Sequence, residues 1–213
     1  MDVSFELRLF LYLADMAGVA VFAISGALAA GRKSLDWLGV IIISVVTAVG
    51  GGTLRDMMLG NQPVFWIQDP TYLVVIIASA GVTLLYSRYR KPPYRLLLMA
   101  DAFGLALFAI LGAIIAERFE VSGIVVVIMG TMTGVAGGII RDLLTNEVTL
   151  VVRRDFYATA AIIGIVLYLA LKSYGIPQTP SAVLGIVWII VLRMAAIFHG
   201  LRLPVFQLPQ EPS

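Results

Sequence analysis

The sequence predicts an all-α polytopic membrane protein with seven transmembrane helices, arranged as two inverted three-helix repeats plus a seventh helix. Composition, an internal repeat and a doubled glycine–arginine–aspartate motif lead to this prediction. Hydrophobic residues make up 60% of the 213 residues and charged residues 13%, whereas charged residues are about a quarter of a soluble domain. A membrane span takes roughly 20 apolar residues. The chain therefore has room for six or seven spans and for no soluble catalytic domain.

Composition also excludes several classes of function. The absence of cysteine excludes disulfides, thiolate catalysis and sulfur-ligated metals. The formal net charge of +2 is too small to indicate nucleic-acid binding. The sequence contains no nucleotide-binding loop, metal cluster or nucleophile–base set. We therefore expect a protein that is surrounded by membrane lipids, is not an enzyme, and needs no cofactor or resident metal.

Apolar length and polar punctuation place the seven spans. They are expected at residues 9–30, 37–58, 70–87, 95–116, 122–144, 155–173 and 181–200. The first span is not a cleaved signal peptide, because its leading flank is acidic, its apolar run is long and it contains Asp15.

An internal repeat relates the two halves of the chain. A shift of 86 residues aligns 15–78 with 101–164 without a gap, so that Asp15 falls on Asp101 and Arg55 on Arg141. Each unit holds three spans, and this odd number inverts the second copy in the membrane. The expected units are a first repeat at 9–87, an inverted repeat at 95–173, a seventh helix at 181–200 and a disordered cytoplasmic tail at 203–213.

The distribution of lysine and arginine predicts the orientation. Nine basic residues fall on one face of the predicted topology and three on the other. The nine are Arg32, Lys33, Arg88, Arg90, Lys91, Arg95, Arg153, Arg154 and Arg202, and the three are Arg8, Arg118 and Lys172. The richer face is expected in the cytoplasm, so the N-terminus lies outside and the C-terminus inside.

A glycine cluster followed by Arg-Asp lies inside the second span and again inside the fifth. The candidate pathway residues are Gly50, Gly51, Gly52, Arg55 and Asp56, then Gly137, Gly138, Arg141 and Asp142, with Thr47 and Thr133 one turn earlier. Glycine loosens a helix interior, and a charge within a span needs a partner or a water-filled cavity. We therefore expect a kink or break in both helices, facing a transport pathway. The alternative is tight helix packing, which small residues at every fourth position allow.

Two acidic residues in other spans are candidate partners of these arginines. At about 1.5 Å of rise per residue, Asp15 lies level with Arg55 near the outside, and Asp101 lies level with Arg141 near the cytoplasm. The hypothesis is that these residues form two gate-like polar clusters beside the glycines. In the alternative, each arginine pairs with the aspartate that follows it.

Other polar and aromatic residues are assigned to the membrane interface. Arg193 is expected to extend toward the interface or to contact a neighbouring subunit, and His199 to lie at the interface. The expected interface anchors are Trp37, Trp66, Tyr72, Tyr86 and Tyr89.

The doubled Gly-Gly-x-x-Arg-Asp motif and the lone seventh helix resemble the prokaryotic trimeric intracellular cation (TRIC) channel family, over residues 9–200. The resemblance implies a homotrimer with one pore per protomer, lined mainly by the first, second, fourth and fifth spans and kinked at the motif glycines. It also implies passage of monovalent cations, chiefly potassium ions. Because nothing in the sequence indicates an organelle address, a bacterial plasma membrane is expected.

Three functional hypotheses remain open. The first is a potassium-permeable channel, in which the arginines, which would repel cations, are neutralised by Asp15, Asp56, Asp101 and Asp142 or form a closed gate. The second is a carrier of small neutral amino acids such as glycine, because this repeat group also bears a glycine-transporter label and helix N-termini favour carboxylates. The third is a structural membrane protein, which predicts that Arg55→Gln and Arg141→Gln leave every flux unchanged.

Overall fold

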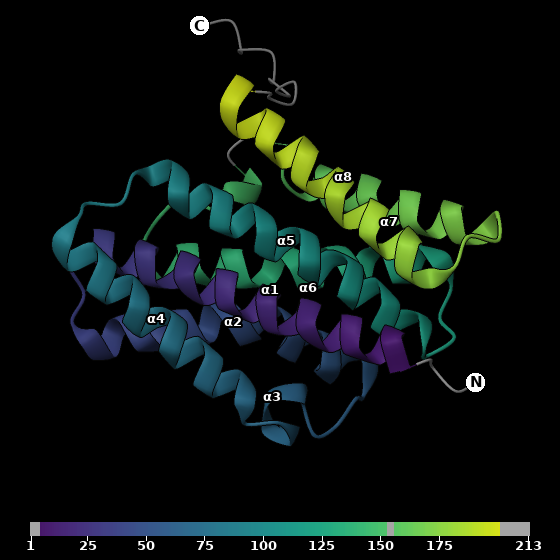
Figure 1. Ribbon diagram of the computed structural model, residues 1–213, viewed down its shortest axis with the longest axis horizontal. Helices are drawn as coiled ribbons and strands as arrows, with labels where there is room; N and C mark the ends of the chain where they lie inside the picture. The colour runs from purple at the N-terminus through teal and green to yellow at the C-terminus, as the bar shows by residue number, and fades with distance from the viewer. Residues whose placement is uncertain (1–4, 153–155, 201–213) are drawn as a thin grey trace, which may run out of the picture.

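The computed structural model describes residues 5–152 and 156–200, so the predicted tail at 203–213 lies outside the described residues. Within the described ranges the chain forms eight α-helices, one 3-10 turn and no strand (Figure 1). The elements are α1 (Phe5–Arg32), α2 (Trp37–Leu59), α3 (Phe65–Gln68), α4 (Thr71–Tyr89), α5 (Tyr94–Glu117), α6 (Gly123–Leu144), η1 (Leu150–Val152), α7 (Ala158–Ser173) and α8 (Gln178–His199).

Seven of these helices correspond to the seven predicted spans, which confirms the predicted fold class. In the described part of the chain, six are long and apolar enough to cross a membrane, and α7 is a shorter apolar helix. Helix α3, a four-residue helix between α2 and α4, was not predicted from the sequence. Figure 1 shows α1 and α5 running in opposite directions along the long axis, as expected when α5–α6–α7 is an inverted copy of α1–α2–α4.

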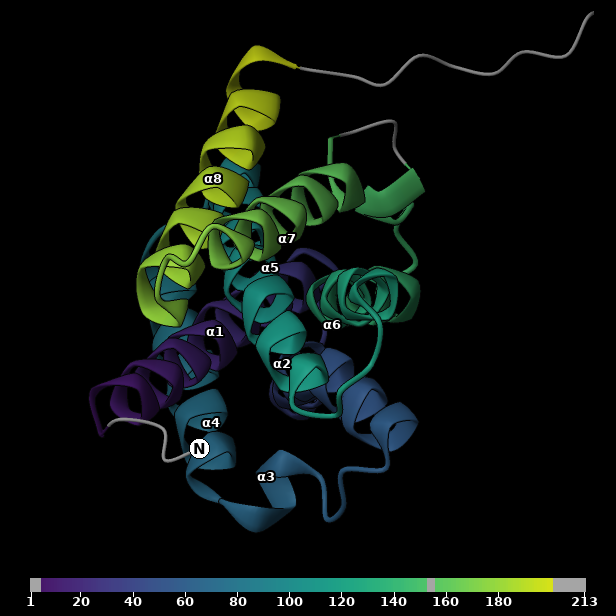
Figure 2. The ribbon, with the colours of Figure 1, turned by 90° about the vertical axis from the view of Figure 1, so that its right-hand side faces the viewer.

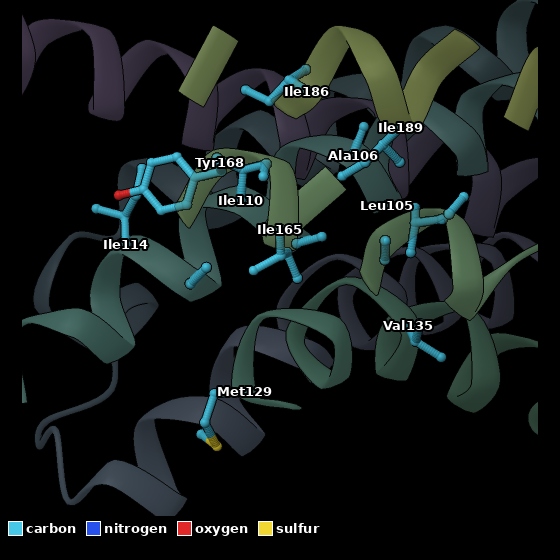
Figure 3. Close-up of a cluster of buried hydrophobic side chains, with 14 of the residues drawn as sticks. Leu105, Ala106, Ile110, Ile114, Met129, Val135, Ile165, Tyr168, Ile186 and Ile189 are labelled. Atoms are coloured by element: carbon cyan, nitrogen blue, oxygen red, sulfur yellow. The ribbon is translucent and has the colours of Figure 1, made fainter. Parts of the chain in front are cut away.

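Helix α5 lies at the centre of the bundle, between α1, α6, α7 and α8 (Figure 2). Its apolar side chains contribute Leu105, Ile110 and Ile114 to the largest buried cluster, where they meet Ile165 of α7 and Ile189 of α8 (Figure 3). This packing buries α7 and α8 against α5. The seventh span therefore covers α5 and has no counterpart in the first repeat.

Reciprocal contacts between α1 and α5 follow the internal repeat. Gly18 of α1 lies against Phe108 of α5, and Gly104 of α5 lies against Phe22 of α1. The two phenyl rings have centroids 5.3 Å apart. Because Gly18 aligns with Gly104 and Phe22 with Phe108 in the repeat, these contacts indicate a local two-fold axis between the helices.

Helices α2 and α6 make a second reciprocal contact at the glycine motifs. A Cβ atom on Gly51 would lie 2.0 Å from the carbonyl oxygen of Thr133, and one on Gly137 would lie 2.3 Å from that of Thr47. Both helices are continuous from Trp37 to Leu59 and from Gly123 to Leu144, so the expected break is absent. The glycines let the two backbones touch, because only a residue without Cβ fits at these positions.

Candidate functional site

The Arg141 cluster consists of Arg141, Asp101, Asp142 and Ser25. Arg141 is fully buried, as is Asp101 on α5. Its Nη1 atom lies 2.6 Å from Asp101 Oδ1 and also donates a hydrogen bond to the Ser25 hydroxyl of α1. Its Nε atom donates to Asp142 Oδ1 at 2.9 Å. The cross-helix pair and the pairing with the following aspartate, proposed as alternatives, are thus both present here, and the cluster joins α1, α5 and α6.

The Arg55 cluster consists of Arg55, Asp56, Phe65 and Asn61. Arg55 is 2% exposed, its Nε and Nη2 atoms both lie 2.8 Å from Asp56 Oδ1, and its guanidinium faces the Phe65 ring at 5.7 Å. The described residues contain no ion pair between Arg55 and Asp15. The predicted cross-helix pair is therefore wrong in this half, where the alternative pairing holds.

Asp15 is held by a tyrosine in place of the arginine. The Tyr72 hydroxyl of α4 donates a hydrogen bond to Asp15 Oδ2 at 2.6 Å. Tyr72 is buried, so its assignment as an interface anchor is wrong. The sequence argument considered only depth along the membrane normal, which places Asp15 and Arg55 at one level. It did not consider Tyr72, which approaches from α4 and binds the Asp15 carboxylate.

The aspartate of each motif also holds the segment after its helix. Asp56 Oδ2 accepts a hydrogen bond from the Phe65 amide at 3.1 Å, and Asp142 Oδ2 accepts one from the Leu150 amide at 3.0 Å. Each carboxylate thus binds its arginine through one oxygen and the following segment through the other. A charge paired in this way is stable at membrane depth.

A cavity of about 270 Å³ opens beside Asp15, at the end of the bundle where α1 begins. Its lining combines opposite charges with aromatic residues: Arg8, Tyr12, Asp15, Tyr72 and Arg118, together with apolar side chains of α1 and α5. The cavity next to the Arg141 cluster, which touches Asp142, measures only about 20 Å³. Asp15 thus borders a larger cavity than the one that Asp142 borders, and a further cavity of about 420 Å³ beside the smaller one is lined by Leu28, Arg32 and Leu97.

Asp69 lies near this cavity, in the turn between α3 and α4. Hydrogen bonds from the Thr71 hydroxyl and amide hold the pKa of Asp69 below its ordinary value, and the Tyr12 hydroxyl adds to the effect. The Thr71 amide donates at 2.9 Å and the Tyr12 hydroxyl at 3.3 Å. In the described part of the chain, no group of three or more histidines or carboxylates is suited to a metal ion.

The remaining predicted residues lie at the crossing of α2 and α6 or beside it. Thr47 and Thr133 are buried, and their hydroxyls donate to Ile43 and Met129 of their own helices, each at 2.6 Å. Gly50, Gly51 and Gly137 form the close helix contact. Gly52 makes room for the Phe65 ring, and Gly138 makes room for Asp101 and Tyr157.

Tyr157 and Arg193 are site residues that the sequence reasoning missed. Arg193 of α8 is 1% exposed, donates to the Phe156 carbonyl at 3.1 Å and stacks on the Tyr157 ring at 4.6 Å. Arg193 was expected to extend toward the interface or to contact a neighbouring subunit. Both expectations are wrong, because its side chain is buried inside the bundle. A signal was available: Tyr157 falls one residue from the repeat counterpart of Tyr72, which holds Asp15.

Comparisons with known proteins agree with this geometry. A protein-family model described as "Glycine transporter" matches residues 12–88 and 98–173. The UPF0126 inner membrane protein YadS of Escherichia coli (strain K12) is 45% identical over 202 residues, covering 94% of this chain and 98% of that protein. The structure of the TRIC trimeric intracellular cation channel orthologue from Rhodobacter sphaeroides superposes with a TM-score of 0.86 at 38% identity, over 90% of this chain and 99% of that one. A prokaryotic TRIC channel in 0.5 M KCl gives a TM-score of 0.86 at 29% identity, over 92% and 100% of the two chains.

Proposed function

The chain belongs to the family described as glycine transporter and has the fold of prokaryotic TRIC channels, and from this premise we propose that it conducts monovalent cations, chiefly potassium ions. The resemblance to TRIC channels inferred from the sequence is confirmed by the solved TRIC structures. The chain is a membrane protein of channel fold and is not an enzyme.

The observation that carries the proposal is the charge of the two clusters. Arg141 pairs with two carboxylates, Asp101 and Asp142, whereas Arg55 pairs with Asp56 and the Tyr72 hydroxyl holds Asp15. An unpaired arginine on the pathway would repel cations. Two carboxylates beside one guanidinium give the Arg141 cluster a formal negative charge, and Asp56 neutralises Arg55. This arrangement favours a cation over an anion.

We assign the gate to the Arg141 cluster. Its ion pair is fully buried, and the neighbouring cavity of about 20 Å³ is too small for a hydrated ion, whereas Asp15 borders a cavity of about 270 Å³. On this assignment the pathway is open on the Asp15 side and shut at the Arg141 cluster. Opening requires Arg141 to separate from Asp101, with the helix crossing at Gly51 and Gly137 as the pivot.

The proposed setting is a homotrimer in the bacterial plasma membrane, with the N-terminus outside and the Arg141 cluster toward the cytoplasm. The basic residues from Arg88 to Arg95 and those after α1 lie at the end of the bundle opposite the start of α1 (Figure 1), as the positive-inside rule expects. The inner-membrane YadS protein supports the location, and the trimeric Rhodobacter orthologue supports the assembly.

A carrier for small neutral amino acids is the second candidate. The family description supports it, and so does the Asp15 cavity, in which Arg118 and Asp15 offer opposite charges to a zwitterion. Transport of this kind would use the same inverted repeats with alternating access.

Proteoliposomes distinguish the two candidates. Vesicles loaded with KCl and containing purified protein should release potassium when a counter-ion pathway is supplied, and an excess of glycine should leave that release unchanged. Arg55→Gln and Arg141→Gln should alter the rate. Accumulation of labelled glycine without potassium release would reject the channel, and flux unaffected by either substitution would favour a structural role.

A further inference from the structure

Each repeat contains an arginine, two aspartates and a tyrosine, but these side chains are paired differently in the two repeats. Among the described residues of the first repeat, Arg55 pairs with the aspartate that follows it and not with Asp15, which is bound by the Tyr72 hydroxyl at 2.6 Å. In the second repeat Arg141 pairs with Asp101 as well as with its following aspartate. The first repeat therefore displays the arrangement that the second repeat would adopt if Arg141 released Asp101.

The second repeat also contains the substitute partner for such a release. The Tyr157 hydroxyl and Asp101 Oδ2 are both buried and, within the described chain, form no hydrogen bond of standard geometry, although the hydroxyl lies close enough to Asp101 to interact with it. They lie over the same glycine: a Cβ atom on Gly138 would be 2.7 Å from the Tyr157 hydroxyl and 3.1 Å from Asp101 Oδ1. Arg193, stacked on the ring at 4.6 Å, fixes Tyr157 on this side of the carboxylate.

Resting on the proposed channel function, we propose that Tyr72 and Tyr157 are positioning residues of the gate, each able to take the acidic side chain of its half from the arginine. Exchange of Asp101 from Arg141 to Tyr157 opens the Arg141 cluster. A buried carboxylate that loses its cation is strongly destabilised, so the gate needs a donor that takes over. A tyrosine hydroxyl supplies a charge-assisted hydrogen bond, and Arg141 keeps Asp142 throughout, as Arg55 keeps Asp56.

One further difference between the repeats favours the shut state of the Arg141 cluster. Ser25 accepts a hydrogen bond from Arg141, whereas its repeat counterpart is Leu111, an apolar residue in the lining of the Asp15 cavity. Leu111 therefore offers Arg55 no acceptor equivalent to the Ser25 hydroxyl. The carboxylate is therefore held by the arginine in the second repeat and by the tyrosine in the first.

Single-channel recording of Tyr157→Phe in planar bilayers tests the proposal. Loss of the hydroxyl removes the open-state partner of Asp101, so the open probability should fall about tenfold while the conductance of each opening stays the same. Tyr168→Phe is the matched control, because it removes a buried hydroxyl of α7 that bonds Glu117 away from the clusters; its open probability should equal that of the wild type. An unchanged open probability in a conducting Tyr157→Phe channel would overturn the exchange.

A spectroscopic measurement judges the exchange independently of conduction. Fluorotyrosine placed at residue 157 should give two ¹⁹F signals in slow exchange, and Asp101→Asn, which weakens the pair with Arg141, should shift their populations. A single signal that Asp101→Asn leaves unmoved would reject the exchange. If the wild type carries no current, the proposed function fails, and the fluorine spectra still decide whether Asp101 changes partner.

Discussion

The close contact of α2 and α6 makes Gly51→Ala the sharpest test of what the motif glycines do. The added methyl would sit 2.0 Å from the Thr133 carbonyl oxygen, well inside van der Waals contact. The atom it meets is backbone, so no side chain can rotate away. The two helices must therefore move apart by roughly an ångström or more, which also strains the reciprocal contact of Gly137 with Thr47.

The expected cost follows from the physics of overpacking. Forcing extra atoms into a packed interior costs about 1–3 kcal/mol, and a contact with rigid backbone belongs at the upper end, near ~3 kcal/mol. The better helix propensity of alanine returns only about 0.5–1 kcal/mol. Gly51→Ala should thus destabilise the protein by roughly 2 kcal/mol, and Gly137→Ala, with its methyl at 2.3 Å from Thr47 O, by a similar amount.

Thermal unfolding in detergent, followed by circular dichroism or by loss of the size-exclusion peak, measures the effect. Gly81→Ala is the matched control, because Gly81 lies inside α4 and a Cβ there has nothing within 4 Å. This control should keep or slightly raise the unfolding temperature. If Gly51→Ala unfolds at the wild-type temperature, the glycines are not contact residues, and their role as a flexible break regains support.

Three further predictions concern the polar residues. Arg141→Gln leaves buried Asp101 without its cation and should cost about 3–5 kcal/mol, more than Arg55→Gln, whose arginine pairs with a single carboxylate among the described residues; equal losses in denaturant unfolding would contradict this ranking. Ser25→Ala removes one acceptor of Arg141 and should raise the open probability severalfold, corresponding to about 1 kcal/mol, while a lower open probability would contradict its role in holding the gate shut. Because Asp69 has a lowered pKa, its hydrogen bonds stabilise the fold above the ordinary value of 3.8 and are lost as the pH falls through the lowered pKa; Asp69→Asn should therefore lose less unfolding temperature than the wild type on acidification below that value.

The fold class could be predicted from the sequence, because composition and internal repeats reflect the arrangement of membrane spans. Apolar length located the spans, and the repeat gave the inverted relation of the halves. Helix α3 was not predictable, because four residues carry no periodicity. The start of α7 was set too early, since the predicted span ran from residue 155 and the helix begins at Ala158.

The site was predictable along the membrane normal but not across it. Helical rise put Asp101 level with Arg141 correctly, and the pair forms. The same argument failed for Asp15, because Tyr72 approaches from α4 and takes the carboxylate. Lateral position depends on how helices rotate and pack, which a single span does not reveal.

The glycine motif shows a second limit of sequence reasoning. Glycines that break a helix and glycines that let two helices touch have the same pattern, and only the partner decides between them. Here the partner is a carbonyl oxygen of the opposite repeat at each position. Arg193 is similar: a charge near the end of a span suggests the interface, but a tyrosine ring and a carbonyl oxygen hold it inside the bundle.

The most direct test of the central claim is the reversal potential of single channels in planar bilayers under asymmetric KCl. The channel account predicts discrete openings that reverse near the potassium equilibrium potential, because two carboxylates accompany Arg141 and Asp56 neutralises Arg55. Openings that reverse near the chloride potential would contradict the charge argument. A silent bilayer, together with labelled glycine accumulating in vesicles of the same protein, would reject the channel in favour of the carrier.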